Sequence, residues 1–107
     1  MTRTVSPREL ETLLASDQPP LLLDVRRTSD YDQDPAMIPD AIRQDPNEIE
    51  HWASDLPAER EVVIYCVRGG SVSNSVLDAL LERDIPARFI EGGIEAWKQS
   101  GGTTKGS

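Results

Sequence analysis

The sequence predicts an α/β fold with a mostly parallel sheet and helices on both of its faces. Short apolar runs alternate along the 107 residues with segments whose apolar positions have helical spacing. The runs at residues 21–25 and 61–65 are too short for helices and are almost entirely apolar, which is typical of strands buried on both faces. Strands that alternate with helices form parallel sheets, and the helices cover them. The length is that of one domain.

The first element is expected to be a helix that begins at Pro7. Ser6 and Glu9 have the spacing of a capping box, and proline suits the first helical position. The apolar positions that follow lie on one helical face: Leu10, Leu13 and Leu14. Residues 18–20, which include two prolines, end this helix, and the first clear strand follows at residues 21–25.

The stretch from Arg26 to Asp45 is polar and rich in aspartate and proline. We expect it to be mostly loop, with room for a short strand near Ala41 and Ile42. A second helix is expected after Asp45, because the sequence there repeats the helix-start chemistry. Its apolar positions follow at helical spacing: Ile49, Trp52 and Ala53.

The second half of the chain continues the alternation. The strand at residues 61–65 precedes a third helix, which is marked by five apolar positions: Val72, Val76, Leu77, Leu80 and Leu81. A third strand is expected at residues 87–90 and a last helix at 94–99. We expect residues 1–99 to form the domain and residues 100–107, which hold three glycines and no apolar residue, to be a flexible tail.

Charge and composition exclude several classes of partner. The chain has 11 basic and 19 acidic residues, and this net charge of −8 argues against nucleic acid or an anionic membrane as a partner. No apolar run approaches the roughly 20 residues of a membrane span, and the N-terminus lacks the apolar stretch of a signal peptide. One cysteine and one histidine give no support for a metal site. We expect a cytoplasmic protein with a reduced thiol and no cofactor.

Cys66, the single cysteine, lies between the second strand and the third helix. It precedes Gly69 and Gly70, so a turn at this point can aim backbone N–H groups at one spot. The N-terminus of a helix favours an anion, and the thiolate is the nucleophilic form of cysteine. A cysteine at the end of a buried strand also serves simply as a small apolar side chain. The two glycines and Arg68 favour the nucleophile.

Three motifs resemble those of single-domain rhodaneses, the thiosulfate sulfurtransferase family. Residues 23–26 (LDVR) are similar to a strand end of that family, residues 65–71 (YCVRGGS) to its active-site loop, and residues 91–97 (EGGIEAW) to its closing GGxxAW element. Residues 38–42 resemble its HIPGAI segment, with Met37 where histidine is usual and Asp40 where glycine is usual. The four segments lie in the family's order, and the resemblance covers about residues 5–99.

The resemblance implies a five-stranded, mostly parallel sheet and a persulfide chemistry. Cys66 would take the outer sulfur of thiosulfate or a similar small anionic donor, form a persulfide, and pass the sulfur to cyanide or a thiol, including a protein thiol. The loop residues that follow would bind the substrate: Val67, Arg68, Gly69, Gly70 and Ser71. Asp24 and Arg26 would support the site structurally, with the acid fixing backbone amides and Arg26 pairing with it or with another carboxylate.

Two loop residues have alternative interpretations. Arg68 either binds or steers the anionic end of the substrate, or it faces solvent or pairs with a carboxylate. Ser71, which stands where many members of the family have arginine, either donates a hydrogen bond to the substrate or only caps the helix. Ser73 is a further hydroxyl donor within reach of the loop. Trp97 is expected in the core, and His51 on the surface.

Two other functions compete with sulfur transfer. Phosphatases and arsenate reductases of related fold have a loop one residue longer and an arginine six positions after the cysteine, where this chain has Val72. Without that guanidinium, a tetrahedral oxyanion loses its bidentate partner. The second competitor is a non-enzymatic module that binds a partner or senses oxidants through Cys66. The absence of a second cysteine excludes an intramolecular disulfide in such a sensor.

Overall fold

The computed structural model describes residues 3–56, 60–68 and 70–105. In these ranges, five strands form one sheet with the order β1-β5-β4-β2-β3, and every neighbouring pair is parallel. The strands are β1 (Thr4–Val5), β2 (Leu21–Asp24), β3 (Ile42–Arg43), β4 (Val62–Tyr65) and β5 (Ala87–Ile90). The predicted α/β class and five-stranded sheet are confirmed.

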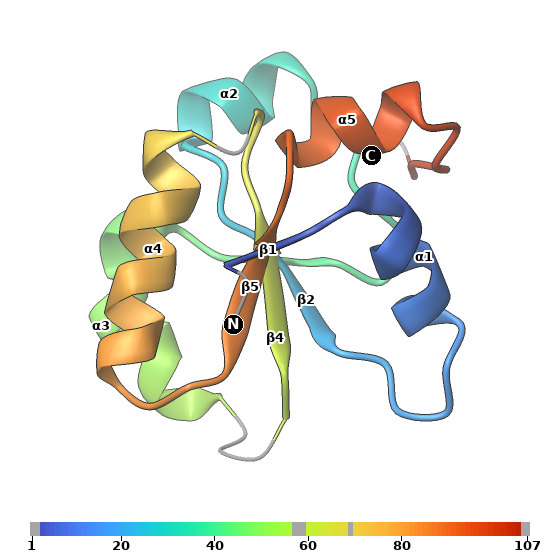
Figure 1. The fold of residues 1–107 in the computed structure, drawn as a ribbon. Helices are drawn as coiled ribbons and strands as arrows, with labels where there is room; N and C mark the ends of the chain where they lie inside the picture. The colour runs from blue at the N-terminus through green and yellow to red at the C-terminus, as the bar shows by residue number, and fades with distance from the viewer. Residues whose placement is uncertain (1–2, 57–59, 69, 106–107) are drawn as a thin grey trace.

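Helices cover both faces of the sheet, and one lies beyond its edge (Figure 1). The helices are α1 (Pro7–Leu14), α2 (Thr28–Gln33), α3 (Ile49–Trp52), α4 (Ser71–Glu82) and α5 (Gly93–Gln99). Two 3₁₀ turns, η1 (Pro46–Glu48) and η2 (Ala53–Asp55), flank α3. Helices α3 and α4 pack on one face, α1 and α5 on the other, while α2 lies beyond the carboxyl ends of the strands. No helix of the described ranges is long and apolar enough to cross a membrane.

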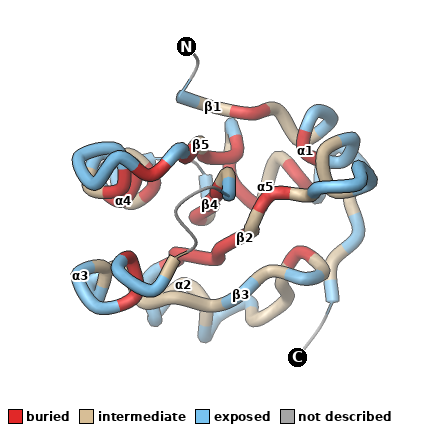
Figure 2. The backbone as a smooth tube through the Cα atoms, turned by 90° about the horizontal axis from the view of Figure 1, so that it is seen from below, coloured by how far each residue is buried: buried red, intermediate tan, exposed pale blue. Residues whose placement is uncertain are grey.

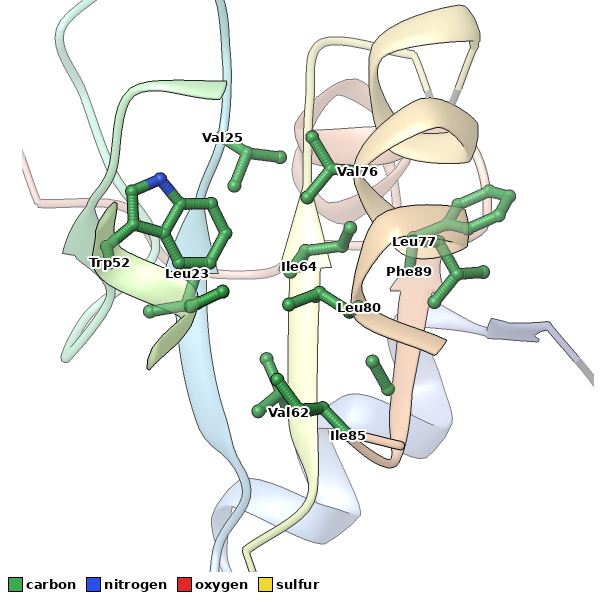
Figure 3. Packing of buried hydrophobic residues seen from close by; sticks show 12 residues of the cluster. Leu23, Val25, Trp52, Val62, Ile64, Val76, Leu77, Leu80, Ile85 and Phe89 are labelled. Carbon is green, nitrogen blue, oxygen red and sulfur yellow. The ribbon is translucent and has the colours of Figure 1, made fainter. Parts of the chain in front are cut away.

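The core has two halves because successive strand residues point to opposite faces. In β4, Val62 and Ile64 join the cluster under α3 and α4, whereas Val63 and Tyr65 join the cluster under α1 and α5. Figure 3 shows the first cluster packed between the sheet and α3 and α4. The buried stretches of the backbone accordingly gather in β2, β4 and β5 between the two helical layers (Figure 2). Both faces of β4 are therefore buried in the core.

Most elements lie where the sequence predicts them. The capping box of α1 is present, with Ser6 Oγ accepting from the Glu9 amide at 3.1 Å and the Glu9 carboxylate accepting from the Ser6 amide at 3.3 Å. The expected helix after Asp45 is broken into η1, α3 and η2, although Asp45 does cap its start by accepting from the Asn47 amide at 2.9 Å. Strand β1 is only two residues long and was not predicted.

The prediction that residues 26–45 are mostly loop is wrong at α2. This helix buries none of its six residues, so its sequence has no apolar periodicity that would reveal it. Its N-cap, Arg27, makes no side-chain capping bond either. The short strand expected near residues 41–42 is present as β3, one residue later.

The segment similar to HIPGAI contains a tight turn at Asp40. The Ala41 amide donates to the Ile38 carbonyl at 3.1 Å, and Asp40 adopts a left-handed conformation with φ 69°. Glycine adopts this conformation without strain, whereas side chains other than asparagine and aspartate resist it. The geometry of this turn explains why glycine is usual at this position, and why aspartate is an acceptable replacement.

The described part of the C-terminal segment follows Trp97 back towards the domain. The Trp97 indole donates to the Thr103 carbonyl at 2.7 Å, and Met37 and Lys105 exchange two backbone hydrogen bonds of 3.0 and 2.7 Å. Trp97 is buried, as predicted. The division into a domain of residues 1–99 and a flexible tail of residues 100–107 stays a prediction.

Candidate active site

Cys66 follows directly after β4 at the carboxyl edge of the sheet. Strand alternation turns its side chain towards the face that α4 covers, opposite to that of Tyr65. There the Ser73 hydroxyl donates a hydrogen bond to Cys66 Sγ at 2.9 Å. Ser73 is completely buried and Cys66 is 5% exposed, so the contact is shielded from bulk water.

The thiol lies against the first turn of α4, a helix of 12 residues. Gly70 is the N-cap, and its carbonyl accepts from the Asn74 amide at 3.1 Å and from the Asn74 side chain at 3.0 Å. The first N–H groups of a helix have no partner within the helix, and they carry the positive end of its dipole. This arrangement favours negative charge on the sulfur or on a ligand bound beside it.

Helix α5 supports the loop from behind. Its first turn donates two backbone hydrogen bonds, from Ile94 to the Cys66 carbonyl at 3.0 Å and from Glu95 to the Val67 carbonyl at 3.2 Å. The carbonyls of Cys66 and Val67 are therefore bound by amides of α5, on the side of the loop away from α4. The EGGIEAW segment therefore supports the cysteine loop. The motif was recognisable in the sequence, but the sequence did not show which residues it contacts.

The second glycine of that segment, Gly93, is fitted tightly against the loop. A Cβ atom at this position would lie 2.4 Å from the Val67 carbonyl oxygen and 2.5 Å from the Cys66 carbonyl oxygen. Gly93 also has a φ of 65°, in the left-handed region that favours glycine. Any larger residue would push the cysteine loop away from α5.

The described loop residues after Val67 are exposed. Arg68 is 79% exposed, and its Nε lies 3.0 Å from Glu95 Oε2, so the guanidinium pairs with a carboxylate on α5. Gly69 lies outside the described residues. Gly70 and Ser71 are exposed, and a capping role for Ser71 is wrong because Gly70 is the N-cap and no side chain caps the helix.

A buried ion pair lies beside this loop. Asp24 and Arg26 are 0% and 1% exposed, and the Asp24 carboxylate accepts from Arg26 Nε at 3.0 Å and from a terminal guanidinium nitrogen at 2.7 Å. The Arg26 backbone amide also donates to Asp24, at 3.0 Å. The two remaining contacts of the guanidinium reach the carbonyls of Asp34 at 2.8 Å and Ala36 at 3.0 Å. Arg26 thus ties β2 to the segment after α2, and the expected pairing with Asp24 is present.

The same network includes Tyr65, the strand partner of Asp24. Its ring and that of Tyr31 lie 6.0 and 5.2 Å from the guanidinium carbon of Arg26. Burial, aided by the negative charge of Asp24, raises the pKa of the Tyr65 phenol well above its ordinary value. Burial disfavours the charge on Arg26, yet its hydrogen bonds to Asp24 and the charge of that residue leave the pKa of Arg26 raised.

Two hollows flank α2 at this edge. The α2–α4 hollow, of about 470 Å³, is lined by Arg27, Thr28, Ser29, Pro46, Asn47, Ser71, Val72, Ser75 and Val76. The α2–α5 hollow, of about 390 Å³, is lined by Arg26, Asp30, Gln33, Asp34, Val67, Ile94, Glu95, Lys98 and Gln99. Residues of the cysteine loop or of the turn after it line both hollows.

Sequence reasoning placed Cys66 and its loop correctly between β4 and α4 but missed the residues that support them from α5. In the sequence, the two glycines at 92–93 were a signal that two backbone segments approach closely. Nothing in the sequence indicated that Glu95 contacts the loop. Within the described ranges, no three histidine, cysteine, aspartate or glutamate side chains gather as metal ligands.

Comparisons with known proteins agree with this geometry. The profile of the rhodanese-like domain matches residues 6–100. A sulfurtransferase from Allochromatium vinosum is 32% identical over 102 residues, which cover 94% of this chain and 92% of that protein. A rhodanese-related protein from Thermoplasma volcanium has a similar structure (TM-score 0.82, 19% identity, covering 97% and 98% of the two chains). So does a rhodanese-like domain protein from Staphylococcus aureus (TM-score 0.78, 25% identity, covering 90% and 91%).

Replacement of Gly93 by alanine is expected to destabilise the protein strongly. The new Cβ would collide with two backbone carbonyls, so we expect the free energy of unfolding in urea to fall by roughly 3 kcal/mol or more. Gly101→Ala is the matched control, because Gly101 has a φ of 90° but open space around its Cβ position. It should cost only about 1–2 kcal/mol. Equal losses for the two variants would contradict the tight fit at Gly93.

Tyr65→Phe tests the buried phenol through the pH dependence of stability. The unfolded tyrosine ionises near pH 10, whereas the raised pKa keeps the native one protonated at higher pH. The unfolded state then binds fewer protons, so stability falls with rising pH by up to about 1.4 kcal/mol per unit. We therefore expect the stability of the wild type relative to Tyr65→Phe to start falling at about pH 10 and to keep falling as the pH rises further. Parallel losses in urea titrations of both proteins would disprove this.

Proposed function

The chain belongs to the family of rhodanese-like domains, and we propose that it transfers a sulfane sulfur through a persulfide on Cys66. The observation that carries the proposal is the position of Cys66 Sγ, which the Ser73 hydroxyl contacts at 2.9 Å in the first turn of α4. A nucleophile in this position meets hydrogen-bond donors and the positive end of a helix. A relative of this chain, from Allochromatium vinosum, is named a sulfurtransferase.

In the first step, the Cys66 thiolate attacks the outer sulfur of thiosulfate or a similar donor. A new S–S bond forms, the S–S bond of thiosulfate breaks, and sulfite leaves with its electron pair. The persulfide carries negative charge on its outer sulfur. Ser73 and the free N–H groups at the start of α4 stabilise this charge, as an oxyanion hole stabilises a developing oxyanion.

In the second step, cyanide or a thiolate attacks the outer sulfur and restores the Cys66 thiolate. We assign substrate binding to the loop that joins Cys66 to α4: Val67, Arg68, Gly69, Gly70 and Ser71. The Val67 carbonyl is held by α5, so the loop can present N–H groups rather than oxygen atoms to an anion. Asp24 and Arg26 act as structural support beneath it.

The two competing functions have less support. Val72 lines the α2–α4 hollow at the position where a phosphatase would need a guanidinium. A purely sensing or binding module would not require a hydroxyl directed at a buried sulfur. We further propose that the protein acts in the cytoplasm on a small anionic donor and a thiol or cyanide acceptor, without nucleic acid or membrane partners.

Incubation with thiosulfate alone should add one sulfur atom to the intact chain, as read by mass spectrometry, and cyanide should then remove it as thiocyanate. Cys66→Ser should show neither reaction. Ser73→Ala should form the persulfide about tenfold more slowly, because a hydrogen bond to a charged group is lost. Ser54→Ala, at an exposed serine in η2, is the control. If thiosulfate, polysulfide and a persulfide donor all fail to load Cys66, the proposal is wrong.

Neutralising Arg68 and neutralising Glu95 should change the KM for the sulfur donor in opposite directions. Arg68→Gln removes a positive charge from the loop, so the KM for thiosulfate should rise several-fold at low salt and less at high salt. Glu95→Gln frees Arg68 from its 3.0 Å partner, and the KM should fall. An unchanged KM for Arg68→Gln at low salt would show that Arg68 is not a substrate ligand.

A further inference from the structure

The two hollows beside α2 differ in charge. Among the described residues that line the α2–α4 hollow, Arg27 is the single charged one. The α2–α5 hollow contains Asp30, Asp34 and Glu95, and its cations are already engaged: Arg26 with Asp24 and Lys98 with Asp34. In a chain of net charge −8, an anion that approaches the loop is therefore favoured on the α4 side and disfavoured on the α5 side.

Arg27 has its charge available for a ligand. It is exposed at the N-cap of α2 and forms no ion pair with any other residue that the structure describes. By contrast, Arg26 and Arg68 each bind a carboxylate of the protein. Arginine binds carboxylates in a planar, bidentate manner, which suits a ligand with such a group.

The size and lining of the α2–α4 hollow suit a molecule much larger than thiosulfate or cyanide. About 470 Å³ lies within the range of small-molecule sites. Hydroxyl and amide groups of Thr28, Ser29, Ser75 and Asn47 surround it, and apolar side chains such as Val72 form part of the wall. Polar groups placed around an apolar patch match the alternating amides and methylenes of a peptide-like compound.

The hollow adjoins the thiol through the first turn of α4. Ser71 and Val72 line the hollow, and Ser73, the next residue, donates to Cys66 Sγ. Helix α2 lies beside this turn (Figure 1). A tripeptide spans roughly 10 Å when extended, so a ligand of this size anchored at Arg27 can extend along the hollow towards the first turn of α4.

We propose that the α2–α4 hollow binds the sulfur acceptor, a peptide-sized thiol that carries a carboxylate, and that Arg27 recognises this carboxylate. The inference rests on the proposed function, which supplies the Cys66 persulfide. The acceptor thiolate attacks the outer sulfur, so a new S–S bond forms on the acceptor. The S–S bond to Cys66 breaks, its electron pair returns to Cys66 as the thiolate, and the acceptor leaves as a persulfide.

Binding can be measured without any reaction. S-methylglutathione, which has the carboxylates but no free thiol, should perturb amide resonances of Thr28, Ser71 and Ser75 in the full chain. Arg27→Gln should weaken this binding about fivefold to tenfold, and Arg27→Lys should restore part of it. Arg8→Gln, which makes the same charge change on the exposed surface of α1, is the control and should bind as the wild type does.

The kinetic test compares two acceptors on chain preloaded with sulfur. Arg27→Gln should raise the KM for glutathione about fivefold to tenfold and leave the KM for glutathione diethyl ester, which lacks the carboxylates, nearly unchanged. Ser75→Trp should fill the hollow and raise both. Both variants are loaded to completion with thiosulfate before the acceptor is added, so that these KM values report the second step alone.

The outcomes separate this inference from the proposed function. If no donor loads Cys66, the proposed function fails, while the S-methylglutathione titration still tests the hollow. If Cys66 loads normally but Arg27→Gln changes neither the Kd of S-methylglutathione nor the KM of glutathione, the assignment of Arg27 is wrong. Equal KM values of the wild type for glutathione and its diethyl ester would also overturn it.

Discussion

The ion pair between Asp24 and Arg26 is the constraint on which the carboxyl edge of this sheet depends. Both groups are removed from water, which costs several kcal/mol per ion unless the pair is fully hydrogen-bonded. Here every guanidinium nitrogen has a partner, because Nε and one terminal nitrogen donate to Asp24, this terminal nitrogen also donates to the Ala36 carbonyl, and the other donates to the Asp34 carbonyl. These contacts hold α2, a helix with no buried residue, beyond the carboxyl ends of the strands. The two hollows on the flanks of α2 depend on this position.

The cysteine loop is held from two sides by different means. In front, the first turn of α4 offers Ser73 and its free N–H groups to the sulfur. Behind, the first turn of α5 draws the carbonyls of Cys66 and Val67 away. Separating donors from acceptors across the loop makes one side electropositive without a metal ligand or a buried lysine among the residues described. A protein that is acidic overall can in this way keep a local site for anions.

Sequence patterns predicted the parts of this fold that bury apolar surface, and they failed where other forces decide the structure. The strands β2, β4 and β5 and the helices α1 and α4 have clear apolar patterns, and α1 also has a capping box. Helix α2 has neither an apolar pattern nor a capping signal. Its position is instead fixed by the contacts of Arg26 with the segment that follows α2. The order of motifs located Cys66, but the pairing of Arg68 with Glu95 joins residues 27 apart in sequence, and no local rule brings them together.

The strand order also dictates when the site can form during synthesis. β1, the first strand, pairs with β5, the last, so the sheet cannot close before residue 90 has been made. The carbonyls behind the cysteine gain their partners later still, when Ile94 and Glu95 emerge. All contacts between strands are non-local, which is the topology that folds slowly. The Cys66 thiol is thus translated before its environment exists, and a chain truncated ahead of α5 would lack the two backbone hydrogen bonds that hold its loop from behind.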